Sequence, residues 1–230
     1  NSNSAMGKSS IGQCILLPDA CHDAGFAMTS SFSTMLLTAF SIFDTDADAR
    51  SNMRQLAKHA EAVLPLLDSQ IRGLKAPTRA VFVGSGPMTF AARECALKVL
   101  ELSAGKIPAL WDSTLGFRHG PKSFISSGTA IYVLRSTENP ATKYEVDLVE
   151  ELRMQFPEAT TMTIGADADL STKSIGSSAW DTVLSILPGQ LASVIWSNQL
   201  GLNIDDPFEG QSTLTRVVSG VRLHPFKATK

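Results

Sequence analysis

Three charged residues in one short segment have the types and spacing that proton transfer requires. Glu94, Lys98 and Glu101 are four and three residues apart, so on an α-helix they share one side. A carboxylate on a partly buried helix can have its pKa raised toward neutral pH and act as a general base. The same spacing is also typical of a solvated stripe whose charges pair with one another.

A histidine follows this segment on a loop shaped by glycine and proline. His119 lies within residues 116–123, between Arg118 and Lys122, and after a predicted strand at Ile107–Trp111. Binding and catalytic residues often lie on loops at the ends of strands. Arg118 and Lys122 could hold substrate anions, although solvated charges give the same pattern. His119 is therefore a second catalytic candidate.

The elements that position these residues alternate between strand and helix patterns. Short apolar, β-branched runs predict strands at Ile15–Pro18, Arg79–Val83, Ile107–Trp111, Thr129–Leu134, Thr160–Gly165 and Thr182–Ile186. Amphipathic stretches and cap residues predict helices at Ser30–Phe43, Arg54–Ile71, Met88–Ser103, Ala141–Gln155 and Pro188–Leu202. This alternation predicts an α/β fold in which helices cover both faces of a parallel sheet.

The turn after the strand at Arg79–Val83 contains part of a dinucleotide-binding pattern. Gly84 and Gly86 open the next helix, and Asp112 ends the following strand, where a ribose-binding acid would stand. However, Thr89 occupies the third glycine position, and a partial pattern of this kind is a weak signal. We therefore predict no bound NAD and no other cofactor.

Two further motifs lack essential parts of the sites they suggest. Gly7-Lys8-Ser9 has serine where a phosphate-loop glycine should stand, and no strand precedes it. Cys21-His22-Asp23 has no second pair of ligands at metal-binding spacing. Neither a nucleotide phosphate loop nor a metal site is predicted.

Composition is that of an ordinary globular protein. Of the 230 residues, 43% are hydrophobic and 18% are charged, and the net charge is −2. This charge gives no electrostatic reason to expect nucleic acid or an anionic membrane as a partner, and no apolar run is long enough to span a membrane. Three cysteines without C-x-x-C spacing predict reduced thiols and a cytoplasmic location.

The motifs taken together resemble a known family. The segments Phe82–Pro87, Ala92–Leu102 and Arg118–Pro121 are similar to the second sugar isomerase (SIS) domain of phosphosugar isomerases. The GFRHGPKS run that begins at Gly116 and the RVVSGV run that begins at Arg216 resemble the tagatose-6-phosphate ketose/aldose isomerase family, whose members look like galactosamine-6-phosphate deaminases. The resemblance covers nearly the whole chain and implies a SIS-type three-layer αβα sandwich.

The resemblance also implies a domain organisation. Residues 1–76 correspond to the rear part of a first SIS domain, 77–204 to a second SIS domain, and 205–230 to a C-terminal substrate loop. The phosphate-binding loop of the first domain would then lie upstream of Asn1, so the chain is expected to be a fragment.

The resemblance assigns catalytic roles to two residues. The family counterpart of Glu101 is the base, and the counterpart of His119 assists ring opening across a subunit interface. A homodimer or higher homo-oligomer with a shared active site is therefore implied. Glu94 and Lys98 match the other charged positions of the helix, where they pair, position or bind substrate.

Further binding candidates lie at both ends of the chain. Thr29 and Ser30 border the sugar in the family, and a free helix N-terminus also suits an anion. Related synthases carry a lysine that forms a Schiff base where this sequence has Arg216. Arginine stays protonated, so we expect Arg216 to bind an anion or orient the open-chain sugar instead.

The function implied is a deaminating ketose/aldose isomerase that converts galactosamine-6-phosphate to tagatose-6-phosphate and ammonia. Two alternatives remain open: a plain aldose–ketose phosphosugar isomerase, and a non-catalytic SIS regulator that only binds sugar phosphate. The presence of both Glu101 and His119 argues against the regulator, which needs neither. The epimer of the sugar is not decided by these residues.

Overall fold

The computed structural model of the chain describes residue 8 and residues 13–211, 214–216, 220, 222 and 224. Its five strands are β1 (Arg79–Gly84), β2 (Ala109–Ser113), β3 (Thr129–Leu134), β4 (Thr160–Gly165) and β5 (Leu170–Ser171). They form one sheet in the order β2-β1-β3-β4-β5, and every neighbouring pair is parallel. The predicted parallel α/β fold is confirmed.

Seven α-helices and two short 3-10 helices connect and flank these strands within the described residues. They are η1 (Asp19–Cys21), α1 (Ser30–Phe43), α2 (Ala49–Arg72), α3 (Pro87–Leu102), α4 (Thr114–Phe117), η2 (Gly120–Phe124), α5 (Ala141–Gln155), α6 (Ser178–Ser185) and α7 (Leu187–Gln199). The predicted bounds of α1 and α5 are confirmed. Helix α2 begins earlier than predicted because the Asp48 carboxylate caps it, accepting a 3.0 Å hydrogen bond from the Ser51 N–H.

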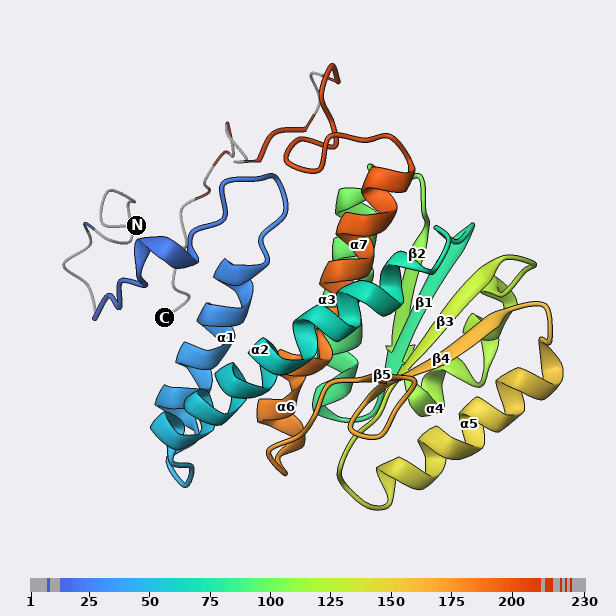
Figure 1. Cartoon of the computed structure of the whole chain (residues 1–230), viewed down its shortest axis with the longest axis horizontal. Coiled ribbons are helices and arrows are strands. Elements are labelled where there is room, and N and C mark those ends of the chain that lie inside the picture. The colour runs from blue at the N-terminus through green and yellow to red at the C-terminus, as the bar shows by residue number, and fades with distance from the viewer. Residues whose placement is uncertain are drawn as a thin grey trace.

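Helices cover both faces of the sheet, as Figure 1 shows. Alternate residues of a strand point to opposite faces, so Phe82 packs in one core and Val83 in the other. The first core takes its helical side chains mainly from α2, α3 and α7, and the second takes them from α4 and α5. Helix α3 and the segment that follows β2 therefore lie on opposite sides of the sheet.

Two predicted strands are wrong. The run at Thr182–Ile186 belongs to α6 and the turn into α7, where Leu184 is buried beside Trp180 and α2. A short, continuously buried apolar run has the same pattern in a helix as in a strand, so periodicity could not separate them. The run at Ile15–Pro18 forms no strand, and Ile15 and Leu16 are more than half exposed.

Some predictions fall outside the described residues or remain untested. The polar N-terminal segment at 1–10 is described only at Lys8, and Val217, Val218, Ser219 and Val221 of the C-terminal motif are not described. In the described part of the chain, no helix has both the length and the apolar character of a membrane span. The three-part domain division stays a prediction. Helix α1 packs against α6, and α2 packs against both α6 and α7.

The close packing of α7 on α3 provides a test of the fold. A Cβ added at Gly189 would lie 2.5 Å from Cys95 Sγ and 2.6 Å from its Cβ. Gly189→Ala should therefore lower the free energy of unfolding by about 1–3 kcal/mol through overpacking, measured by urea denaturation. Helix propensity alone predicts the opposite sign, a gain of about 0.5–1 kcal/mol. Gly120→Ala, whose added Cβ meets no atom within 4 Å, is the matched control.

Candidate active site

Helix α3 starts at the carboxyl end of β1, and the turn between them needs its glycines. A Cβ at Gly84 would lie 2.7 Å from the backbone of Met88, and Gly86 adopts a positive φ of 52°. Pro87 then occupies the first helical position, where no N–H is needed. The helix consequently runs tightly along the sheet, and its inward side is buried against α7.

Lys98 is held between two carboxylates on α3. Its Nζ lies 2.5 Å from Glu101 Oε2 and 3.7 Å from Glu94 Oε1. The side chains of Lys98 and Glu94 are only 4% and 5% exposed, whereas that of Glu101 is 27% exposed. The solvated-stripe interpretation is therefore wrong for Glu94 and Lys98. Glu101 is the member of this charged triad that solvent or a substrate can reach.

Glu94 is the proton-holding group of the triad. Burial raises the pKa of Glu94 to about 7, and the charge of Glu101 adds to this while Lys98 partly opposes it. Glu94 Oε1 has no hydrogen-bond partner among the described residues. Near neutral pH the triad can therefore gain or lose one proton on a buried carboxyl group beside Lys98.

His119 lies between α4 and η2, on the other side of the sheet from the triad. Its neighbours Arg118 and Lys122 both form ion pairs with Glu151 of α5, and Arg118 Nε lies 3.2 Å from Glu151 Oε2. Hydrogen bonding from Lys122 lowers the pKa of Glu151. These pairs fix the segment on the α5 face, so the structure does not bring His119 and Glu101 together within one chain. Anion binding by Arg118 stays a prediction.

Thr29 and Ser30 do not present a free helix N-terminus, contrary to the sequence expectation. The Asp23 carboxylate accepts hydrogen bonds from the Thr29 N–H at 2.9 Å and the Ser31 N–H at 2.8 Å. The Ser30 hydroxyl also donates to it, at 2.9 Å. Burial by itself would raise the pKa of Asp23, but these hydrogen bonds outweigh it and hold the pKa well below its usual range. The Asp23 carboxylate therefore occupies the anion position expected at the N-terminus of α1.

Arg216 joins the same cluster. Its guanidinium donates a hydrogen bond to the Asp23 backbone carbonyl and lies 3.4 Å from His22 Nε2. The structure thus brings three predicted binding residues, Thr29, Ser30 and Arg216, around Asp23. The sequence suggests Asp23 only as a metal ligand, and no group of three metal-binding side chains occurs among the residues that the structure describes. An acid seven residues before the first residue of a helix has no standard cap spacing that would have revealed its role.

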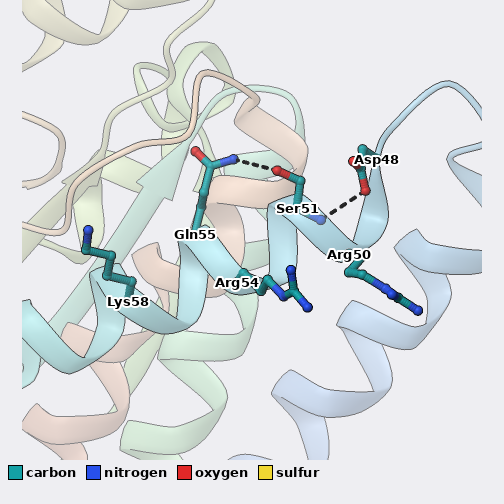
Figure 2. Close-up of a pocket in the computed structure, with 6 residues that line it drawn as sticks. All are labelled: Asp48, Arg50, Ser51, Arg54, Gln55 and Lys58. Atoms are coloured by element: carbon teal, nitrogen blue, oxygen red, sulfur yellow. Dashed lines mark hydrogen bonds between the residues drawn. The ribbon is translucent and has the colours of Figure 1, made fainter.

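A separate cationic groove of about 380 Å³ lies along the first half of α2. Figure 2 shows its lining: Asp48, Arg50, Ser51, Arg54, Gln55 and Lys58. Within the described chain Arg50, Arg54 and Lys58 form no ion pair, and all three are exposed. This groove contains none of the site residues predicted from the sequence, and its charges are those of a solvated helix face.

Known proteins match this chain in both sequence and fold. The chain is 37% identical over 212 residues to the D-galactosamine-6-phosphate deaminase AgaS of Shewanella sp. strain ANA-3, covering 91% of this chain and 54% of the relative. The crystal structure of tagatose-6-phosphate ketose/aldose isomerase from Escherichia coli superposes with a TM-score of 0.85 at 31% identity, covering 99% of this chain and 63% of that one. The chain belongs to the SIS family of phosphosugar isomerases.

Other SIS structures extend the match. One from Clostridium novyi gives a TM-score of 0.81 at 33% identity over 93% of this chain and 59% of that one. No protein-family model matches the sequence. The chain spans between about half and two-thirds of the length of these relatives.

The raised pKa of Glu94 predicts a pH dependence of stability. A carboxyl group that binds its proton more tightly when folded stabilises the fold below its ordinary pKa of 4.5, and this contribution is lost as pH rises toward 7. Glu94→Gln should remove that loss, which we expect to be on the order of 2 kcal/mol. The measurement is the difference in urea midpoints between wild type and variant from pH 4.5 to 8, in which other titrating groups cancel. A difference that does not change with pH would contradict the assignment.

Proposed function

We propose that this protein is a deaminating ketose/aldose isomerase that takes galactosamine-6-phosphate and water to tagatose-6-phosphate and ammonia. The observation that carries the proposal is the triad: a carboxylate that solvent can reach, Glu101, is paired with a buried lysine. The names of the curated relatives support the amino sugar phosphate as substrate.

Glu101 acts as the base that moves a proton between two sugar carbons. After ring opening, it removes the C2 proton of the open-chain amino sugar and returns a proton at C1. This leaves an imine at C2, which water hydrolyses to the ketone and ammonia. Lys98, 2.5 Å from Glu101 Oε2, orients the carboxylate and stabilises its charge when it is ionised. Glu94, when it is ionised, pairs with Lys98 from the buried side at 3.7 Å.

His119 assists ring opening from a second copy of the chain. The sheet separates it from Glu101 within one chain, so a site that uses both residues takes His119 from another subunit. An apolar surface on α3 and β2 supports association of copies, since Phe90, Leu97, Leu100 and Trp111 are 40–70% exposed. We therefore propose a homodimer or higher homo-oligomer with a shared active site.

We further propose that Arg216, Thr29 and Ser30, which cluster around Asp23, border the sugar in this site. Arg216 carries a positive charge beside the N-terminus of α1 and binds an anionic or hydroxyl group of the open-chain substrate. Formation of a Schiff base is not part of this mechanism, because arginine is not a nucleophile at neutral pH. No cofactor takes part in the proposed reaction.

Plain aldose–ketose isomerisation is the second candidate, and the name of the related Escherichia coli structure favours it. It uses the same C2-to-C1 proton transfer by Glu101 but starts from a sugar without an amino group. Because only deamination releases ammonia, product analysis separates the two reactions. A regulator that binds sugar phosphate would carry out neither.

The base assignment is tested with Glu101→Gln in the native full-length protein. We expect ammonia release from galactosamine-6-phosphate to fall roughly 10²–10⁴-fold, because glutamine fills the same space but cannot accept the proton. Glu150→Gln, an exposed glutamate on α5, is the control and should keep wild-type activity. If the Glu101→Gln variant releases ammonia as fast as wild type, Glu101 is not the base. Conversion of a neutral aldose phosphate without ammonia release would favour the plain isomerase.

The shared site is tested by mixing two inactive variants. Glu101→Gln and His119→Ala should each be inactive, but subunit exchange between them should restore up to about a quarter of wild-type activity, because half of the sites in mixed dimers are intact. The measurement is ammonia release after the two proteins are mixed and allowed to exchange subunits. Exchange demonstrated by a tag pull-down, with no recovery of activity, would rule out the shared site.

A further inference from the structure

The sheet contains a topological switch point that the proposed mechanism does not use. Helix α3 leaves β1 on one face and leads to β2, whereas α5 leaves β3 on the other face and leads to β4. In open parallel sheets, ligands usually bind in the crevice beyond the carboxyl ends of two such strands. Here that crevice lies between the turn at Ser85 and the turn at Ser136.

Each turn carries a serine hydroxyl group that is paired with a hydroxyl group at the start of a helix. Ser85 Oγ donates to Thr114 Oγ1 at 2.8 Å, and Ser136 Oγ lies 2.9 Å from Ser178 Oγ. The Thr137 N–H donates to Ser178 Oγ at 3.1 Å. Hydroxyl and N–H groups gathered at strand ends are the donor set that proteins use for phosphate groups.

A carboxylate of the chain fills this position. Glu145 of α5 is fully buried, and its Oε2 accepts a 2.9 Å hydrogen bond from the Ser136 N–H. Burial raises the pKa of Glu145, and donors on Ser136 and Ser85 together with the charge of Arg135 partly offset this effect. Oε1 has no hydrogen bond of good geometry among the described residues, although Ser85 is close enough to favour the ionised form.

Packing alone gives no reason for a carboxylate here. Its neighbours on the inward side of α5, Leu148 and Leu152, are fully buried apolar side chains. A buried carboxyl group without complete pairing is costly, and an apolar residue of similar size avoids that cost. The features that suit an anion are the Ser136 N–H that donates to Glu145 and the donor groups of Ser85 beside it.

We propose that Glu145 is a built-in anion that occupies the ligand position of this sheet. The switch-point crevice is then a phosphate-type site closed by the chain's own carboxylate, and it takes no phosphate group. Replacing Glu145 by a small neutral residue opens the site to inorganic phosphate. The inference does not depend on the proposed enzymatic activity, because its test measures binding alone.

The test compares phosphate binding by wild type and Glu145→Ser, using calorimetric titration and the thermal midpoint. We expect the variant to bind inorganic phosphate at least about tenfold more tightly than wild type. Glu150→Ser removes one carboxylate from the exposed side of the same helix and should bind phosphate as wild type does. Adding Ser85→Ala to Glu145→Ser should reduce the gain, which separates this crevice from the cationic groove at Arg54.

Three outcomes would overturn the inference. The first is a folded Glu145→Ser variant whose phosphate affinity equals that of wild type. The second is a gain in phosphate affinity that the Glu150→Ser variant shares, or that does not change when Ser85→Ala is added to Glu145→Ser. If Glu145→Ser unfolds in phosphate-free buffer, phosphate should restore its folding beyond the stabilisation given to Glu150→Ser. A variant that stays unfolded in phosphate is the third contrary outcome.

Discussion

The close approach of α7 to α3 is the constraint on which the rest of the site depends. With no side chain at Gly189, α7 lies directly on Cys95, and α3 is enclosed between α7 and the sheet. This enclosure removes Glu94 and Lys98 from water while Glu101, one turn further along, stays partly accessible. A packing contact between two helices thereby decides which of three charges on one helix face can meet a substrate.

Burial changes how these charges behave. In water, a Glu–Lys–Glu stripe contributes little, because each charge is solvated and screened. Inside the protein the attraction of Lys98 for both carboxylates is stronger, and the cost of removing Glu94 from water raises its pKa to about 7. The triad therefore combines a fixed cation, a carboxyl group that exchanges a proton near neutral pH, and an accessible carboxylate. That combination suits proton transfer at carbon.

The chain supplies its own anions at two positions where anions usually bind. Asp23 receives the N–H and hydroxyl groups at the start of α1, and Glu145 receives the Ser136 N–H at the switch point of the sheet. Asp23 lies six to eight residues before its donors and Glu145 lies nine residues after Ser136, so the conformation of the intervening loops positions both carboxylates. In the described part of the chain, these internal contacts already use the donors that a general anion-site rule would assign to a ligand.

The sequence by itself determined the parallel α/β fold, the bounds of α1 and α5, and the common face of Glu94, Lys98 and Glu101, because these follow from local periodicity and caps. It could not separate the buried helix α6 from a strand, since both read as a short apolar run. Only the tertiary structure decided that Glu94 and Lys98 are buried, that Asp23 fills the start of α1, and that the sheet separates His119 from Glu101. Burial depends on contacts between distant segments, and the pairing of Asp23 depends on how the loop before α1 folds back on it; periodicity and cap rules describe neither.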